Sequence, residues 1–80
     1  MNPRFVVITA PNDQYLINLN DIVYVEKETK GGSGYLAIHL SKNIDIKLRA
    51  VIKIIDNIFA GIQNALNSDK LVYEINGEKE

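Results

Sequence analysis

Eighty residues suffice for one hydrophobic core, so we expect residues 1–80 to form a single small domain. Apolar residues make up 46% of the chain and charged residues 24%, a globular balance that excludes a disordered or fibrous chain. A net charge of −1 argues against a strongly cationic nucleic-acid binder, and the lack of cysteine excludes disulfides, thiolate metal sites and thiol nucleophiles.

The first half of the chain has the alternation of β-strands. Residues 4–10 are rich in β-branched side chains, and a proline-containing turn separates them from a second strand over residues 15–19. Residues 22–28 form a third strand. The glycine-rich segment 29–34 then predicts a loop, because three glycines in four positions hold neither a strand nor a helix stably.

A hairpin is the clearest pattern in the chain. Apolar and polar residues alternate on both sides of a short polar turn at residues 41–43, which indicates a half-buried antiparallel pair. The expected buried face consists of six aliphatic residues, Leu36, Ile38, Leu40, Ile44, Ile46 and Leu48.

The period then changes to that of an amphipathic helix over residues 49–67. The apolar residues at its centre fall within an arc of roughly 80°, and their apolar neighbours widen this arc to about 160°. Residues 71–75 form a last short strand, and residues 76–80 form a frayed acidic tail. We therefore predict an α+β domain in which one long helix packs on one face of an antiparallel sheet of about five short strands.

The width of the apolar arc predicts self-association. A helix packed on one sheet needs a stripe of about 100°, so this helix has more apolar surface than one sheet covers. Small domains without disulfides or metals often gain stability by association, most simply as a two-fold dimer. The residues expected to make the contact are Ile52, Ile54, Phe59 and, if the last strand is shared, Leu71, Tyr73 and Ile75. A further protein partner stays open.

No arrangement of residues predicts an enzyme, a metal site or a cofactor. His39 has no obvious catalytic partner near it in sequence, so an exposed strand residue is the simpler interpretation. Glu26 and Glu28 share one strand face about 7 Å apart, which suits paired acid–base work or a divalent cation, but exposed acidic strand ends are commoner. The glycine-rich segment leads into a strand, whereas phosphate-binding loops lead into a helix.

Four cations, Lys42, Lys47, Arg49 and Lys53, form a basic cluster that would contact a nucleic-acid backbone if they share one surface. Arg49 and Lys53 are expected on the polar face of the helix. The negative net charge makes nucleic acid an unfavoured partner. A membrane is excluded as well, since no stretch approaches the ~18 uninterrupted apolar residues of a spanning helix, and we expect a cytoplasmic protein.

Two families share patterns with this chain. The run Tyr15-Leu16-Ile17-Asn18-Leu19-Asn20-Asp21-Ile22-Val23-Tyr24-Val25-Glu26, the hairpin over residues 36–48 and the helix together resemble small flagellar proteins of the FlbD family. In that family a strand pair, a hairpin and an amphipathic helix make up the whole protein. The resemblance covers about residues 5–62 and implies a small accessory or interaction protein rather than an activity.

The second resemblance is to LytTR-type DNA-binding domains. Asp21-Ile22-Val23-Tyr24-Val25-Glu26 is similar to their "D-I-x-Y-I-E" strand, and Lys47-Leu48-Arg49 before the helix is similar to their basic strand end. That family continues after the helix with a cationic "F-x-R-x-H-R-S" segment. This chain instead has Asp69-Lys70-Leu71-Val72-Tyr73-Glu74-Ile75, without arginine or histidine. A DNA-binding regulatory domain is therefore the alternative function.

Overall fold

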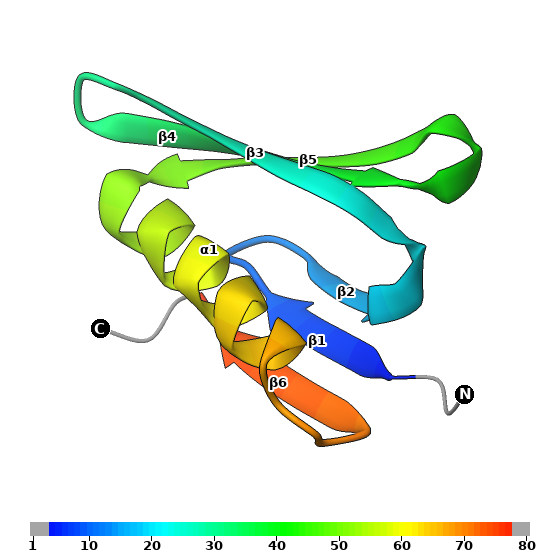
Figure 1. The fold of residues 1–80 in the computed structure, drawn as a ribbon. Helices are drawn as coiled ribbons and strands as arrows, with labels where there is room; N and C mark the ends of the chain where they lie inside the picture. The colour runs from blue at the N-terminus through cyan, green and yellow to red at the C-terminus, as the bar shows by residue number, and fades with distance from the viewer. Residues whose placement is uncertain (1–3, 78–80) are drawn as a thin grey trace.

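The computed structural model describes residues 4–77, which form six strands, one α-helix and two short 3-10 helices (Figure 1). In chain order these elements are β1 (Phe5–Thr9), β2 (Gln14–Asn18), η1 (Leu19–Asp21), β3 (Ile22–Lys30), β4 (Ser33–Leu40), η2 (Ser41–Asn43), β5 (Ile44–Val51), α1 (Ile52–Leu66) and β6 (Val72–Asn76). The predicted α+β class is confirmed. The predicted single sheet of about five strands is wrong, because the strands divide between two sheets.

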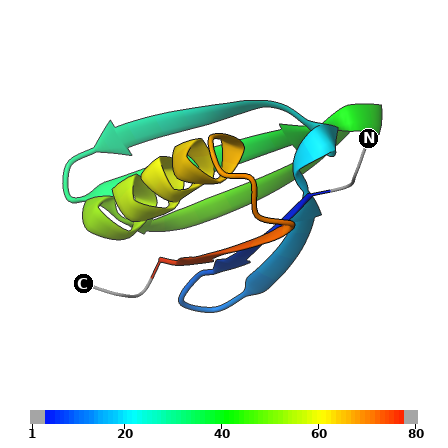
Figure 2. The ribbon, with the colours of Figure 1, turned by 60° about the horizontal axis from the view of Figure 1, so that its bottom comes forward.

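Each sheet has three strands within residues 4–77. One has the order β3-β4-β5 and is antiparallel throughout. The other has the order β2-β1-β6, in which β2 is antiparallel to β1 and β6 is parallel to it. The last strand therefore joins the first, with Phe5 opposite Val72 and Thr9 opposite Asn76. Figures 1 and 2 show α1 packed between the two sheets, along one side of the molecule.

The helix contributes the centre of the core. Ile55 and Ile58 are fully buried, and Ile62 and Ala65 continue the same face. The helix begins at Ile52, not at residue 49 as predicted, because residues 49–51 still pair with β4. The first helical N–H, that of Ile52, donates to the carbonyl of Gly32 at 3.4 Å, so the start of α1 is tied to the tip of the β3–β4 hairpin.

Both sheets cover the wide apolar arc of the helix. On one flank, Lys27 of β3 lies over the ring of Phe59, with its ammonium 4.9 Å from the ring centre. On another, Gly61 lets α1 approach β6 so closely that an added Cβ would lie 2.8 Å from the side chain of Ile75. One sheet alone would leave the flanks of α1 exposed to solvent. Together the two sheets cover these flanks in part.

The β4–β5 hairpin is confirmed, and half of its predicted inner face is buried. Leu36, Ile38 and Leu48 are buried, and Leu40 and Ile46 are half-buried. Ile44, in contrast, is 54% exposed, and it lies beside η2 at the end of the hairpin that extends past the helix (Figure 1).

Two predicted segments have different limits in the structure. The expected loop over residues 29–34 is only a turn at Gly31-Gly32, because Lys30 and Ser33 already pair across the β3–β4 hairpin, and Gly31 supplies the left-handed φ of 63° that the turn requires. The predicted tail begins later than residue 76, since Asn76 ends β6 and Gly77 is buried against Ile58. The remainder of that tail, residues 78–80, lies outside the described residues.

Candidate functional site

The outer side of the β2-β1-β6 sheet carries a patch of apolar residues, bordered by the polar Gln14, Asn18, Glu74 and Asn76. Val6 and Ile8 of β1 point into the core, so their neighbours Phe5 and Val7 lie on the opposite side of the sheet. Val7 is opposite Leu16 on β2, and Phe5 is opposite Val72 on β6. We call Phe5, Val7, Leu16 and Val72 the apolar face; Leu16 is 68% exposed and Val72 is 51% exposed.

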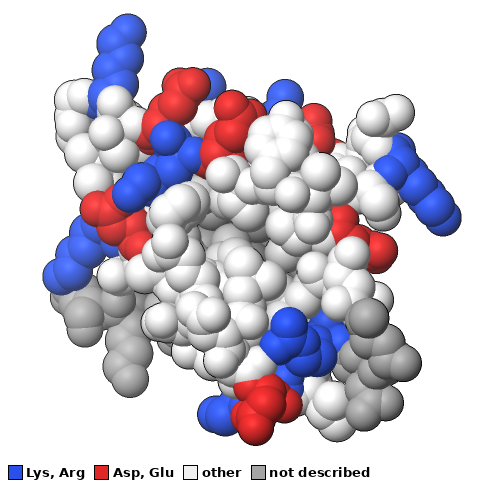
Figure 3. Space-filling view, viewed as in Figure 1, with Lys and Arg blue, Asp and Glu red and all other residues white. Residues whose placement is uncertain are grey.

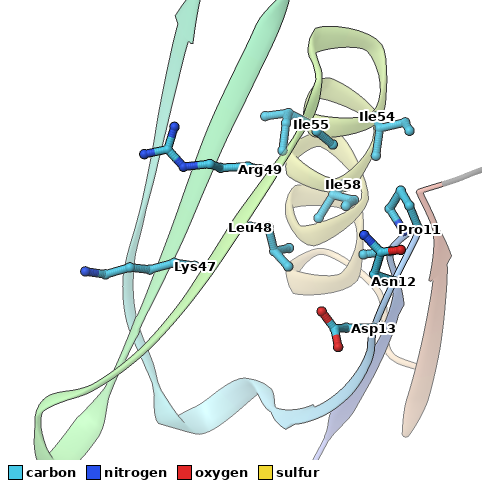
Figure 4. A pocket seen from close by; sticks show the side chains of 11 residues that line it. Pro11, Asn12, Asp13, Lys47, Leu48, Arg49, Ile54, Ile55 and Ile58 are labelled. Atoms are coloured by element: carbon cyan, nitrogen blue, oxygen red, sulfur yellow. The ribbon is translucent and has the colours of Figure 1, made fainter.

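The outer side of the β3-β4-β5 sheet is polar. Leu36 and Ile38 of β4 point into the core, so Tyr35, Ala37 and His39 point outward. The residues paired with them complete this surface, which we call the polar face: Tyr24, Glu26, Glu28, Tyr35, Ala37, His39, Asp45, Lys47 and Arg49. Figure 4 shows Lys47 and Arg49 projecting from β5 away from α1.

A histidine cluster lies near one end of the polar face. The Nε2 atom of His39 is 2.7 Å from Oε1 of Glu26, and its Nδ1 atom is 2.7 Å from Oδ1 of Asp45. The ring of Tyr24 stacks on the imidazole, with 4.0 Å between ring centres and 19° between the planes. We call Glu26, His39 and Asp45 the His39 cluster; it joins all three strands of the sheet.

The two carboxylates act on the imidazole electrostatically. The hydrogen bond to Glu26 and, less strongly, the hydrogen bond to Asp45 raise the pKa of His39 above its ordinary value of 6.5, while partial removal of the ring from water opposes the shift. Each carboxylate lies within hydrogen-bond distance of one ring nitrogen. The nearby Ser41 hydroxyl is directed at Asp21, at 3.5 Å, so it does not lie against the imidazole as a nucleophile would.

A β-bulge shapes the surface beside the His39 cluster. The register between β3 and β4 shifts between Ile22 and Tyr24. As a result Val23 and Tyr24 are 65% and 52% exposed, and both line an open basin with His39 and Asp45. Simple alternation along β3 does not predict this pair of adjacent outward residues.

The four cations of the predicted basic cluster come from β5, η2 and α1, and the expectation that Arg49 lies on the helix is wrong. Arg49 belongs to β5, where its guanidinium lies 5.2 Å from the ring centre of Tyr35, and Lys47 precedes it on the same face. Lys42 lies in the η2 turn and Lys53 in the first turn of α1, both exposed. Carboxylates of the polar face are interspersed with Lys47 and Arg49. On the view in Figure 3, positive and negative side chains also alternate along the upper part, where β3 runs.

The six residues predicted for self-association differ in exposure. Ile75 is buried, which removes it from any contact surface. Ile54, Phe59 and Tyr73 are half-buried against the core, and Ile52 is also half-buried. Leu71, at 58% exposure, precedes Val72 of the apolar face. The sequence analysis did not single out Leu16. Its position next to Ile17 in an alternating strand nevertheless indicated that its side chain points away from the core.

A small pocket lies between α1, β5 and the turn before β2 (Figure 4). Its volume of about 70 Å³ is less than half of the ~150 Å³ cavity that holds a benzene ring. Leu48, Ile55 and Ile58 form its inner wall, and Asn12 and Asp13 lie at the turn. Within residues 4–77 no group of three or more acidic, histidine or cysteine side chains could hold a metal ion. The same residues contain no helix with the length and apolar character to cross a membrane.

No protein-family model matches this chain, and comparisons with curated proteins and with solved structures gave no significant match. The surfaces described above are therefore the observations from which a function is argued.

Proposed function

We propose that this protein is a small, non-enzymatic interaction module that associates with a second copy of itself through the apolar face, most simply as a two-fold dimer. The observation that carries the proposal is the exposure of Leu16 and Val72 on one sheet face, beside the half-buried Phe5 and Val7. Contiguous exposed apolar surface of this kind is typical of protein–protein contacts.

A second copy suits the apolar face because the face is self-complementary. A two-fold axis places the same surface of two copies against each other, so apolar side chains meet apolar side chains. Glu74, opposite Val7 on the edge strand β6, is the charged residue of this face nearest to its centre. Two such sheets would pack about 10 Å apart, as the two layers of a β-sandwich do.

The size of the chain favours the same conclusion. A domain of 80 residues buries a smaller share of its surface than larger domains do, and it has no disulfide to compensate. The resemblance to FlbD-type proteins, which implies an accessory or interaction protein, agrees with this role.

Solution mass tests the proposal. Light scattering over a concentration series should give a dimer for the unmodified protein at high micromolar concentration and a monomer for Leu16→Asp, because the variant replaces the most exposed apolar side chain of this face with a charge that the contact would have to desolvate. Val23→Asp is the matched control: Val23 is 65% exposed, against 68% for Leu16, but lies on the other sheet. A monomer at high micromolar concentration for the unmodified protein would refute the proposal.

Contact with DNA is the weaker alternative. Lys47 and Arg49 lie side by side on β5, as a phosphate-binding strand would require. Three carboxylates, those of Glu26, Glu28 and Asp45, share that face, however, and would repel a phosphate backbone. The geometry of the polar face therefore favours the interaction module.

A further inference from the structure

We propose that the His39 cluster is a proton-dependent clamp, which ties β3, β4 and β5 together at the η2 end of their sheet when the imidazole carries both of its protons and loosens that end when one proton leaves to solvent. This inference is independent of the proposed dimer, because the clamp lies on the polar face and not on the apolar face.

The hydrogen bonds of the cluster depend on the protonation state of His39. An ionised carboxylate only accepts hydrogen bonds, and a neutral imidazole donates only one. Both nitrogens of His39 lie 2.7 Å from a carboxylate oxygen, so both contacts are hydrogen bonds only when the ring is an imidazolium. In the neutral ring, the unprotonated nitrogen would face Glu26 or Asp45 with lone pair against lone pair.

The position of the residues makes this chemistry a link between strands. His39 lies on β4, the central strand, directly opposite Asp45 on β5 and Tyr24 on β3. Glu26 follows Tyr24 by two residues along β3, so its side chain lies on the same face. A charged ring therefore bonds to both neighbouring strands at once, and it also gains the attraction of a cation for the face of Tyr24.

The other charges on this side of the sheet are weaker influences. Lys47 follows Asp45 on the outer side of β5, and Lys42 lies at the rim of the adjoining basin, so both cations disfavour an imidazolium. Glu28 follows Glu26 on β3 and favours it. The two carboxylates of the cluster, in contrast, lie 2.7 Å from the ring nitrogens and act on them directly.

The direction of the pH effect follows from this arrangement. The folded protein holds the His39 proton more tightly than the unfolded chain does, since the pKa of His39 is raised above 6.5. The stabilisation from the cluster is therefore complete below about pH 6.5, and it is lost as the pH rises through the raised folded-state pKa. The strand ends beside η2, where Val23 and Tyr24 are exposed, should loosen over that interval.

Proton NMR of the intact protein tests the clamp directly. His39 is the only histidine, so its imidazole resonances need no assignment. Titration should give a pKa above 6.5 in the unmodified protein, and both Glu26→Gln and Asp45→Asn should lower it. Glu28→Gln is the matched control, on the same strand and face without contact to the ring, and it should lower the pKa less than Glu26→Gln does.

A second measurement separates the clamp from a passive histidine. The Tm of the unmodified protein should fall between pH 6.5 and the raised pKa, while His39→Gln should lack that step. Amide hydrogen exchange should rise over the same interval at the η2 end of β4 and β5 and remain constant in β1. A pKa at or below 6.5, equal effects of Glu26→Gln and Glu28→Gln, or an unchanged step in His39→Gln would each overturn the proposal, whatever the solution mass.

Discussion

The two sheets contrast in how their outer faces meet water. The β3-β4-β5 sheet is long, and on its outer face the His39 cluster, the stacked Tyr24 and the contact of Arg49 with Tyr35 bring polar and charged side chains together. The β2-β1-β6 sheet has three five-residue strands and presents Leu16 and Val72 instead. One helix buries the inner faces of both. This difference is the reason why the proposed contact with a second copy is placed on the shorter sheet.

The largest loss in the free energy of unfolding is expected for a substitution in the core that the two sheets share. Ile58 of α1 is fully buried and packs near Gly77 at the end of β6, in the cluster that also includes Leu36 of β4. Ile58→Ala should lower the free energy of unfolding by about 2–5 kcal/mol, because truncation leaves a cavity that the surrounding strands fill only in part. Urea unfolding followed by circular dichroism measures this loss.

Leu66→Ala is the control for the same helix. Leu66 is 49% exposed, so its truncation should cost much less than that of Ile58. A single transition in every variant would indicate that the two sheets unfold together. Two separate transitions in Ile58→Ala would instead break the view that one core serves both sheets.

Somewhat smaller losses of stability are expected where α1 makes its closest contact with each sheet. An added Cβ at Gly34 of β4 would lie 2.9 Å from Ile55, and one at Gly61 would lie 2.8 Å from Ile75. Such overpacking costs about 1–3 kcal/mol, against a backbone gain of about 0.5–1 kcal/mol on replacing glycine. Gly34→Ala should cost more than Gly61→Ala, since Ile55 is in the centre of the core whereas Ile75 belongs to the edge strand β6.

Thermal unfolding of the two alanine variants checks this order. The reverse order would mean that β6 is held as rigidly as the β4–β5 hairpin. The shorter sheet would then be less dependent on a partner than its exposed face indicates.

Local patterns predicted the elements well. Alternation at Leu36, Ile38 and Leu48 gave the hairpin, and the helical spacing of Ile55 and Ile58 gave the core face of α1, because both periods depend on neighbours in sequence. The start of α1 was wrong by three residues. Residues 49–51 fit two periods. They continue the strand alternation in which Leu48 points inward and Arg49 outward, and they also fit the spacing of the helix.

The arrangement of strands was not predictable in the same way. Val72 pairs with Phe5 from the opposite end of the chain, and no local period carries that information. The His39 cluster was partly within reach: a three-residue turn at residues 41–43 places His39 opposite Asp45. Glu26 was considered only together with Glu28, and its contact with His39 was missed because the expected six-residue loop hid the register that the two-residue turn at Gly31-Gly32 imposes.

A smaller effect is expected at the flank of α1 where it meets β3. The ammonium of Lys27 is 3.0 Å from Asp56 and also covers the ring of Phe59. These side chains are partly exposed, so Lys27→Ala should lower the free energy of unfolding by only about 0.2–1 kcal/mol. A double-mutant cycle with Asp56→Ala separates the ion pair from the ring contact, and a loss well above this range would assign more of the fold's stability to this flank than its exposure supports.

The smallest effect is expected where cations of the polar face are removed. The variant carrying Lys47→Ala and Arg49→Ala should keep the free energy of unfolding within about 0.5 kcal/mol, because both side chains are exposed. Neither it nor the unmodified protein should be retained on heparin at physiological salt, since three carboxylates share that face. Retention of the unmodified protein that falls steeply with salt and disappears in the variant would overturn this contrast. The polar face would then be a phosphate-binding surface, and the longer sheet, not the shorter one, would carry the function.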